Sequence, residues 1–489
     1  MQNKNGQTAK RALLVGAGEG AKLLVGELSR SPLPPFLPVC LADDDPMKRG
    51  LVLGGAPVAG TTAQIPALCA QYRAEVILLC MPSVEGADRR RILKSCLETG
   101  CRIMSMPNLL GLLQERGDLL GSIRQLGIEE LLGRPAARPA FGRSAGCVRG
   151  KTVLVTGGGG SIGSELCRQL ALLGPKRLIL LDIYENNAYQ VQQELLRRHG
   201  GALPLKVVIA SVRDYARLEG IFRSQRPQIV FHAAAHKHVP LMEDCPCEAV
   251  KNNVGGTLNA ARLARLYGAE RFLLVSTDKA VHPANVMGAT KRLCEMVIQA
   301  MGSGGTTVFS AVRFGNVLGS NGSVIPLFEE QIAAGGPVTV TDPDMVRYFM
   351  TIPEAVTLLL EAGSMAKNGE IFILDMGQPV RILDLARRMI RLAGFRPEID
   401  IPIRIIGLRP GEKLREQLLL EGERMEPTGC DRVYRASPLR VDPALPERIA
   451  RLLAAAEQND ETRCRALLRE AVAQAEAVQA AAPVPAPCR

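Results

Sequence analysis

The chain has 489 residues, 47% of them hydrophobic, a formal net charge of +11 at pH 7 and no tryptophan. This balance is typical of globular proteins with large buried cores, and the length allows about three domains. The basic excess is spread along the chain and forms no stripe interleaved with aromatic residues, which argues against nucleic acid as a partner.

The first predicted elements are a strand, a glycine turn and a helix. "RALLVGAGEGAKLLVGEL" begins at Arg11 and contains Gly16 and Gly18, and "PVCLADDDP" supplies a second strand that ends in Asp43. This geometry suits a nucleotide, but no reacting groups lie nearby. We therefore predict an N-terminal Rossmann-like domain over residues 1–130, which either senses an unidentified ligand or is a shell kept for packing or assembly.

A second, stronger copy of this pattern follows a Pro/Gly/Arg-rich linker at 131–150. "KTVLVTGGGGSIGSELCRQLALLG" opens it, and strands alternate with helices until the pattern becomes mixed at about residue 317. The predicted fold class is α/β, with two tandem Rossmann-type doubly wound parallel sheets. The second domain, 151–440, carries a smaller mixed α/β substrate-binding lobe at about 317–440. Residues 441–489 are predicted to be a helical segment with a frayed tail.

The turn "TGGGGSIG" predicts a dinucleotide site. Gly157, Gly160 and Gly163 are spaced GxxGxxG between a strand and a helix, and Asp182 ends the next strand. Such a turn brings the backbone close to a pyrophosphate at a helix N-terminus. Asp182 would bind a ribose diol and repel a 2′-phosphate, which favours NAD, although NADP stays possible because basic residues lie nearby.

The predicted cofactor-binding residues share the carboxyl ends of the strands and the glycine turn: Gly157, Gly160, Ser161, Ile162, Gly163, Asp182, Asp214, Ala233, Ala234 and Lys291. Asp214 has two interpretations. It either meets the adenine or caps the helix that follows.

The strand "RFLLVSTDKAV" delivers Thr277, Asp278 and Lys279 to the edge of the sheet where ligands bind in this fold. Lys291 follows on a helix, and the position four residues before it is Met287, which cannot carry a proton. Taken alone, Asp278 and Lys279 read as a solvated ion pair. Together with the glycine turn and Lys291, they favour redox chemistry.

Seven motifs together carry a resemblance to a known family. They are "TGGGGSIGSELCRQ", "LLDIYENNAY", "FHAAAHKHVPLME", "NNVGGT", "STDKAVHPANVMGATKR", "RFGNVLGSNGSVIPLF" and "LRPGEKLREQLL". The chain resembles, over about residues 10 to 440, the nucleotide-sugar 4,6-dehydratases of the extended short-chain dehydrogenase/reductase superfamily. It is most similar to the long-form UDP-N-acetylglucosamine 4,6-dehydratases of polysaccharide and capsule biosynthesis. In that subgroup Met commonly replaces the catalytic Tyr, as at Met287.

The resemblance implies a lyase reaction that is redox-neutral overall. NAD oxidises C4 of the sugar, water is eliminated across C5 and C6, and the hydride returns to C6, with configuration at C5 retained. Asp278, if neutral, would protonate the departing C6 hydroxyl, and Lys279, if uncharged, would take the C5 proton. Thr277 would hydrogen-bond the C4 oxygen, and Lys291 would hold the nicotinamide ribose. The group that accepts the C4 hydroxyl proton is left undetermined among Asp278, water and the substrate.

The resemblance also implies a set of residues that bind the UDP-N-acetylhexosamine substrate: Lys237, His238, Arg313, Asn316, Arg347, Arg409 and Glu412. An Arg fork suits a diphosphate and a carboxylate suits ribose hydroxyls. The competing interpretations are a core or capping role for His238 and surface salt bridges for Arg347, Arg409 and Glu412.

Two rival functions remain. A nucleotide-sugar 4-epimerase would normally need Tyr at Met287, and a catalytically silent sensing scaffold would treat Met287 as an inactivating change. We expect a cytoplasmic homo-oligomer without a transmembrane segment, although peripheral membrane association is compatible with the sequence. The 13 cysteines lack metal-ligand spacing, so no metal is expected.

Overall fold

A computed structural model describes residues 9–81, 84, 86–106, 119–121, 123–127, 142–437 and 442–480. The chain divides into two compact units. The first unit consists of Met1–Pro135, Leu327–Pro343 and Ile382–Ile406, and the second of Ala136–Pro326, Asp344–Arg381 and Gly407–Arg489. Two pieces of the lobe predicted at 317–440 thus group with the first unit, and the remainder groups with the second.

The first unit contains a mainly parallel sheet with helices. In spatial order its described strands are β3 (Val52–Leu53), β4 (Ala56–Gly60), β2 (Phe36–Ala42), β1 (Lys10–Val15), β5 (Val76–Leu79), β6 (Arg102–Ser105) and β7 (Arg124–Gln125). The pairs β3–β4 and β6–β7 are antiparallel and the others parallel. The helices are α1 (Glu19–Arg30), α2 (Ile65–Tyr72), α3 (Gly86–Leu97) and α16 (Ile382–Leu392).

The second unit is built on a larger sheet. In spatial order its strands are β10 (Leu205–Ile209), β9 (Arg177–Asp182), β8 (Thr152–Thr156), β11 (Ile229–His232), β12 (Arg271–Val275), β13 (Val308–Arg313), β18 (Glu370–Leu374), β22 (Val433–Ala436) and β21 (Met425–Pro427). Pairing is parallel from β10 to β18 and antiparallel through β22 and β21.

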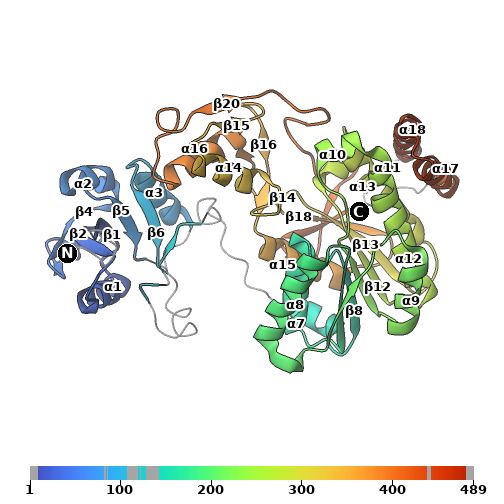
Figure 1. Cartoon of the computed structure of the whole chain (residues 1–489), viewed down its shortest axis with the longest axis horizontal. Helices are drawn as coiled ribbons and strands as arrows, with labels where there is room; N and C mark the ends of the chain where they lie inside the picture. The colour runs from blue at the N-terminus through green and yellow to red at the C-terminus, as the bar shows by residue number, and fades with distance from the viewer. Residues whose placement is uncertain are drawn as a thin grey trace, which may run out of the picture. The chain divides into compact units, whose positions relative to one another are not determined.

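Helices follow the strands of the second unit in the order expected for a doubly wound fold (Figure 1). They are α7 (Ser161–Leu172), α8 (Glu185–His199), α9 (Tyr215–Gln225), α10 (Val239–Asp244), α11 (Pro246–Ala249), the π-helical turn η4 (Val250–Gly255), α12 (Gly256–Leu266), the short turn η5 (Asp278–Ala280), α13 (Val286–Met301), α15 (Ile352–Met365), α17 (Leu445–Glu457) and α18 (Glu461–Ala480), with α14 (Val324–Ala333) crossing the boundary between the units.

The central strands show why the chain folds in this way. All five residues of β8 and all four of β11 are buried, as expected for parallel strands covered by helices on both faces. The strand order places the switch in direction between β8 and β11, where ligands bind in open α/β sheets. The predicted α/β class with Rossmann-type sheets is confirmed.

Part of the predicted linker is structured. Gly142–Val148 form the helix α6, whose Ser144 and Val148 are buried and which contacts α15. Because the segment is short and holds two glycines, its helicity depends on tertiary packing, which local patterns do not report. Residues 131–141 and the predicted frayed tail at 481–489 lie outside the described part of the chain.

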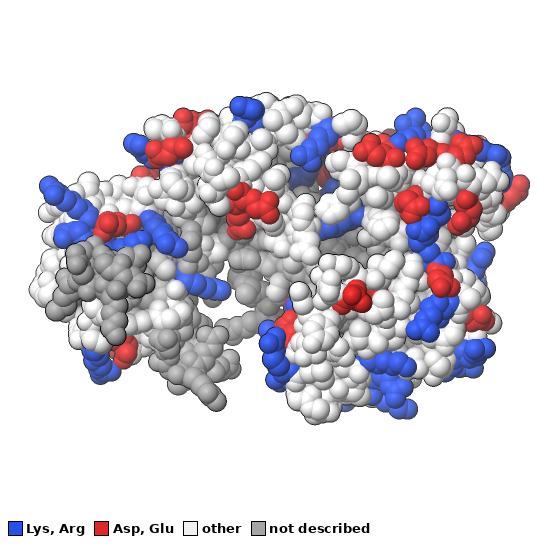
Figure 2. Space-filling model, viewed as in Figure 1, with Lys and Arg blue, Asp and Glu red and all other residues white. Residues whose placement is uncertain are grey.

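The second unit also contains two short pairs of strands outside its main sheet. β14 (Asn316–Val317) pairs with β17 (Phe349–Met350), and β16 (Val346–Arg347) pairs with β19 (Val380–Arg381). In the first unit, β15 (Val338–Val340) pairs with β20 (Ile403–Ile405). On the face that Figure 2 shows, side chains of both charge signs lie interspersed. None of the helices in the described ranges is both long and apolar enough to span a membrane.

Candidate active site

The glycine turn after β8 is packed so closely that side chains would not fit. Gly157 has a φ of +68°, and a Cβ there would lie 2.7 Å from the Ala234 backbone nitrogen. A Cβ on Gly163 would lie 2.0 Å from the carbonyl oxygen of Gly157. The turn thus leads directly into the N-terminus of α7 at Ser161, with Ala233 and Ala234 beside it. This cradle fits a dinucleotide pyrophosphate.

Asp182 is tied to the same turn. Its Oδ2 accepts from the Gly159 amide at 2.8 Å and its Oδ1 from the Tyr184 amide at 2.8 Å. The next side chain, Ile183, is 68% exposed, although it is apolar. An exposed apolar residue at the end of the second strand suits the face of an adenine, and the sequence analysis did not single it out.

A pocket opens along the glycine turn and the start of α7. Its lining includes Gly160, Ser161, Arg168, Asn187, Gly319 and Asn321. The Asn321 amide donates to the Ser161 hydroxyl at 3.2 Å, so the loop after β14 reaches the turn. Neither Gly319 nor Asn321 was predicted; the quoted motif "RFGNVLGSNGSVIPLF" contained them, but gave no reason to place them here.

Asp214 caps a helix, the second of its two predicted interpretations. Its Oδ1 accepts from the Arg217 amide at 2.9 Å, three residues into α9, and its side chain is exposed. This is the usual geometry of an N-cap aspartate. Asp214 therefore has the capping role, and its contact with an adenine stays a prediction.

Thr277, Asp278, Lys279 and Asn316 come together beyond the ends of β12 and β13. Asp278 Oδ1 accepts from the Thr277 hydroxyl at 2.9 Å and from Lys279 Nζ at 3.0 Å. Lys279 Nζ also donates to Asn316 Oδ1 at 3.3 Å. Asp278 is fully buried, which excludes the interpretation of a solvated ion pair. A buried carboxylate, an amine and a hydroxyl in contact form a set that can move protons.

The second oxygen of Asp278 faces a space left by a glycine. Oδ2 is buried and has no hydrogen-bond partner among the residues that the structure describes. A Cβ on Gly315 would lie 3.2 Å from this oxygen and 3.2 Å from the Met376 Cε. Gly315 therefore keeps the surroundings of Asp278 Oδ2 open. A buried unsatisfied oxygen at this position is a feature of functional sites.

The helix α13 carries Met287 and Lys291 and begins next to Lys279. Asn285 caps it by accepting from the Gly288 amide at 2.7 Å, and a Cβ on Gly288 would lie 2.3 Å from the Lys279 carbonyl oxygen. Lys291 Nζ donates to the Val275 carbonyl at 2.7 Å, just before the catalytic stretch. Burial lowers the pKa of Lys291. Met287 is buried, with 4% exposure.

A buried histidine, His232, lies next to the strands and helices that carry the catalytic residues. His232, at the end of β11, lies 2.8 Å from Thr156 Oγ1 through Nδ1 and 3.1 Å from Thr257 Oγ1 through Nε2. Burial, together with the charge of Lys291, lowers the pKa of His232 to about 3. His232 is therefore neutral, and it was not predicted as a site residue.

Lys237 and His238 lie in the exposed loop between β11 and α10. The Lys237 side chain is exposed to solvent, and desolvation by nearby protein atoms, together with the charge of Lys279, lowers its pKa. His238 lies against Gly322, where a Cβ would be 2.5 Å from its Cε1. His238 thus borders the loop 319–323 rather than the core. It stands at the N-cap position of α10, so the capping half of the alternative holds for its place in the chain, although its side chain makes no capping hydrogen bond among the residues described.

Arg313 does not face a substrate, contrary to the sequence prediction. It is fully buried and donates to Glu295 from Nε at 2.8 Å and from Nη2 at 2.7 Å. Its Nη1 donates to Glu423 at 2.6 Å. A fully buried guanidinium loses its hydration, and the two buried carboxylates offset this loss. Arg313 therefore holds the structure together beneath the site.

Arg347, Arg409 and Glu412 are linked through the loop "RPGEK". Arg347 donates to the carbonyls of Lys413 at 2.7 Å and Leu414 at 3.0 Å, and its Nη2 lies 3.7 Å from Glu412 Oε1. The Arg409 amide donates to Glu412 Oε2 at 3.2 Å, and the Arg409 side chain is exposed. Arg347 is thus largely occupied in holding the loop, whereas Arg409 is free to reach a ligand.

The segment 411–421 crosses the catalytic loop and contains a buried carboxyl that was not predicted. Lys413 Nζ donates to the Val281 carbonyl at 2.9 Å, and Asn285 Nδ2 donates to the Gly411 carbonyl at 3.0 Å. Glu416 lies in this segment and is 8% exposed. Its Oε2 lacks a hydrogen-bond partner within the described ranges. Burial raises the pKa of Glu416. The charge of Lys279 lowers this pKa, and the charge of Asp278 raises it further.

The glycine turn of the first unit, at residues 16–18, is held by a hydrogen bond to Asp43. Asp43 accepts from the Ala17 amide at 2.7 Å and from Lys48 Nζ at 3.0 Å. This repeats the relation of Asp182 to its turn. Residues 2–107 match a CoA-binding domain.

Comparison with known families gives a match over most of the second unit. Residues 153–438 match the polysaccharide biosynthesis protein family. The chain belongs to this family. The match contains the glycine turn, the Asp278–Lys279 pair and the "RPGEK" loop, and so covers every element of the site described above.

Two bacterial relatives extend the likeness into the first unit. The probable polysaccharide biosynthesis protein EpsC of Bacillus subtilis is 47% identical over 415 residues, which is 85% of this chain and 69% of EpsC. The capsular polysaccharide biosynthesis protein CapD of Staphylococcus aureus is 45% identical over 434 residues, 88% of this chain and 72% of CapD.

Other similar proteins cover a smaller share of the chain. A UDP-glucose 4-epimerase of Rickettsia rickettsii is 37% identical over 280 residues, 56% of this chain and 79% of the epimerase. The solved structure of Pen from Bacillus thuringiensis has 34% identity and a TM-score of 0.54, and it covers 59% of this chain and 89% of Pen.

Proposed function

We propose that the protein is an NAD-dependent UDP-N-acetylglucosamine 4,6-dehydratase that makes a UDP-4-keto-6-deoxy-N-acetylhexosamine for polysaccharide or capsule biosynthesis. The observation that carries the proposal is the hydrogen-bonded Thr277–Asp278–Lys279 cluster, whose Asp278 is fully buried and which follows the end of β12, while Met287 occupies the helix position that normally holds Tyr. A dehydration needs an acid and a base besides hydride transfer, and this cluster supplies candidates for both.

The residues that would hold the cofactor are Gly157, Gly160, Gly163, Asp182 and Lys291. The glycine turn has the close backbone approach that a pyrophosphate requires, and Asp182 beside it favours NAD over NADP. Bound there, NAD would accept a hydride from C4 and return it at C6. Lys291 would hold the nicotinamide ribose and add positive potential.

The proton transfers are assigned to the cluster. Lys279, in its uncharged form, takes the C5 proton, which becomes acidic once C4 is a ketone, and Asp278 protonates the C6 hydroxyl as it leaves as water. Lys279 exchanges its proton with solvent and returns one to C5 when the hydride reaches C6, which gives the saturated 4-keto-6-deoxy sugar. Thr277 donates to Asp278 Oδ1 at 2.9 Å, so a proton that arrives at Thr277 from the C4 hydroxyl has a hydrogen-bonded route to Asp278. This route would replace the missing tyrosine, with the same carboxyl accepting one proton and later donating it.

The substrate would be held by groups around this cluster. Asn316 accepts a hydrogen bond from Lys279 Nζ at 3.3 Å, and Lys237 is assigned by the resemblance, with its pKa lowered by desolvation and by the charge of Lys279. Arg409 is the exposed guanidinium of the "RPGEK" loop and suits the diphosphate, while Glu412 suits ribose hydroxyls. The proposal includes retention of configuration at C5, a cytoplasmic location and a homo-oligomeric state, as expected from the sequence.

A UDP-sugar 4-epimerase is the second candidate, favoured by the 37% identity to the Rickettsia rickettsii epimerase over 280 residues. Two features argue against it. Epimerisation at C4 has to remove and replace the O4 proton, and Met287 stands where a Tyr would do this. Epimerisation also has no leaving hydroxyl, so it does not need the acid that Asp278 would supply.

Sugar NMR in deuterated water separates these reactions. Purified protein is incubated with NAD and UDP-N-acetylglucosamine. A 4-keto-6-deoxy product that carries deuterium at C5 is expected from the dehydratase. The galacto epimer would replace this proposal with the epimerase, and unchanged substrate with bound NAD would replace it with a silent scaffold.

A further inference from the structure

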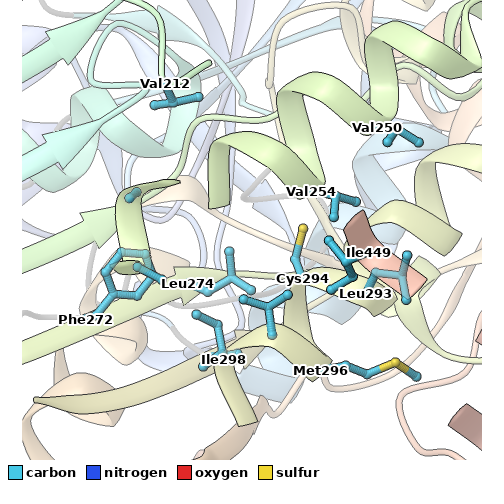
Figure 3. Close-up of a cluster of buried hydrophobic side chains, with 14 of the residues drawn as sticks. Val212, Val250, Val254, Phe272, Leu274, Leu293, Cys294, Met296, Ile298 and Ile449 are labelled. Carbon is cyan, nitrogen blue, oxygen red and sulfur yellow. The ribbon is translucent and has the colours of Figure 1, made fainter. Parts of the chain in front are cut away.

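The C-terminal helices α17 and α18 pack against the helix that carries Met287 and Lys291. α18 contacts α13, and α17 contacts the π-helical turn η4. Ile449, Leu452 and Leu468 of the pair share one buried core with Leu293 and Val254, and Figure 3 shows Ile449 next to Leu293 and Val254. We call α17 and α18 the C-terminal hairpin. The hairpin is therefore part of the core that supports α13.

A carboxylate joins the C-terminal hairpin to the first residue of α13. Glu243, on α10, accepts from the Val286 amide through Oε1 at 2.6 Å. Its other oxygen, Oε2, accepts from Arg465 of α18 at 2.9 Å. The Arg465 and Glu243 side chains are only 30% and 20% exposed, so solvent screens this pair less than a surface pair. A carboxylate at a helix N-terminus also meets the favourable end of the helix dipole.

A second polar contact joins the C-terminal hairpin to η4. Asn459, in the turn between the two helices, accepts from Lys251 Nζ at 2.8 Å, and Lys251 is 8% exposed. Two residues later in η4, Asn253 accepts from the His236 amide at 2.8 Å and donates to Thr290 of α13 at 3.0 Å. π-helical turns often occur at functional sites, and this one connects the hairpin, the 236–238 loop and α13.

We propose that the C-terminal hairpin positions α13 for catalysis, with Arg465 and Glu243 as positioning residues. Neither side chain touches the catalytic cluster. They act through the amide of Val286, which lies one residue before Met287 and five before Lys291 on the same helix. A displacement of the helix start therefore moves Lys291 relative to Val275 and to the nicotinamide site. The kinetic part of this inference rests on the proposed function.

Four variants of the full chain test the proposal. Arg465→Ala removes the cation, and Arg465→Lys keeps a charge at the same place. Glu243→Gln keeps an acceptor for the Val286 amide and removes the charge that attracts Arg465. Arg469→Ala, an exposed arginine of the same helix, is the matched control.

Hydrogen–deuterium exchange and kinetics are the two readouts. Exchange of the amides at 286–291 should be faster in Arg465→Ala than in the wild type or Arg469→Ala, and Arg465→Lys should restore part of the protection. The kcat should fall on the order of tenfold in Arg465→Ala and less in Arg465→Lys, with KM changed much less, because the geometry of α13 changes and the diphosphate contacts do not. The double variant Arg465→Ala with Glu243→Gln should lose less than the product of the single losses.

Wild-type exchange at 286–291 in both Arg465→Ala and Glu243→Gln would overturn the proposal. So would variants that lower only the melting temperature and leave kcat and NAD affinity unchanged. If the wild type does not convert UDP-N-acetylglucosamine, the proposed function is wrong but this inference is still testable. In that case amide exchange at 286–291 and the affinity for NAD together decide whether the hairpin positions α13.

Discussion

The guanidinium of Arg313 donates two hydrogen bonds to the carboxylate of Glu295, at 2.8 and 2.7 Å, and both side chains are fully buried. Glu295 also accepts from the Ser276 hydroxyl at 2.7 Å, one residue before Thr277. The pair therefore connects β13, α13 and the start of the catalytic stretch. Breaking a bidentate pair in the core is costly, although Arg292, whose Nη1 lies 3.1 Å from Glu295 Oε2, still offsets part of the charge of Glu295.

We expect Arg313→Ala to lower the free energy of unfolding by about 3–5 kcal/mol, because Glu295 and Glu423 lose a shared counter-ion in the core. Arg313→Lys should recover part of this loss but not the forked geometry. Urea unfolding measures the effect, and Arg198→Ala, in an exposed pair with Glu194, should change stability by less than about 1 kcal/mol. Unchanged stability with a raised KM would return Arg313 to substrate binding.

Substitution of either member of the acid-base pair should stop turnover and spare the cofactor site. Asp278→Asn and Lys279→Met are each expected to lower kcat by roughly 10²- to 10⁴-fold. NAD should still bind, since neither residue belongs to the glycine turn. Turnover and bound NAD are measured on the same samples, with the exposed Asp244→Asn as control. Wild-type kcat in both variants would show that the assigned roles are wrong.

The space beside Asp278 can be tested with a single methyl group. In Gly315→Ala the new Cβ would lie 3.2 Å from Asp278 Oδ2, so we expect kcat to fall on the order of tenfold while the protein stays folded. Gly220→Ala is the matched control, because it meets open space in α9 and should stabilise the helix by about 0.5–1 kcal/mol. Unaltered kcat in Gly315→Ala would mean that this space is not used in the reaction.

Acid should destabilise the second unit through His232. Its pKa is lowered to about 3 by burial and by Lys291, whereas the unfolded chain has an ordinary histidine pKa of about 6.5. Between these values the unfolded chain binds more protons, so the free energy of unfolding falls as pH decreases from 6.5 towards 3. Urea unfolding at several pH values should show a weaker pH dependence in His232→Gln than in the wild type. Equal slopes would exclude this contribution.

Much of the site could be predicted because its motifs are local. The spacing of Gly157, Gly160 and Gly163 specifies a backbone conformation, and Asp182 follows from the regular length of a strand–helix–strand unit. Thr277, Asp278 and Lys279 end a parallel strand, and the ends of such strands meet at one edge of the sheet. These inferences need no knowledge of distant contacts.

The roles of Arg313, Glu416 and the hairpin depend on distant contacts. Arg313 ends a strand, as a substrate ligand would, yet its partner Glu423 lies 110 residues away in sequence. Glu416 is one of several charged residues in "RPGEKLREQLL", and only the packed segment shows that it is buried. Asp214 had two local interpretations of similar merit; the hydrogen bond from the Arg217 amide supports the cap, and contact with an adenine stays a prediction. Periodicity predicted the C-terminal helices but not the surface that they cover.

That covered surface limits how copies of the protein can meet. Every residue of α13 from Val286 to Gln299 is buried within a single chain. A neighbouring subunit therefore has no access to this helix unless α17 and α18 are displaced. Any symmetric assembly must be formed through other faces, and two catalytic helices cannot lie side by side across its axis. Subunit contacts in this protein are thereby separated from the helix that bears Lys291.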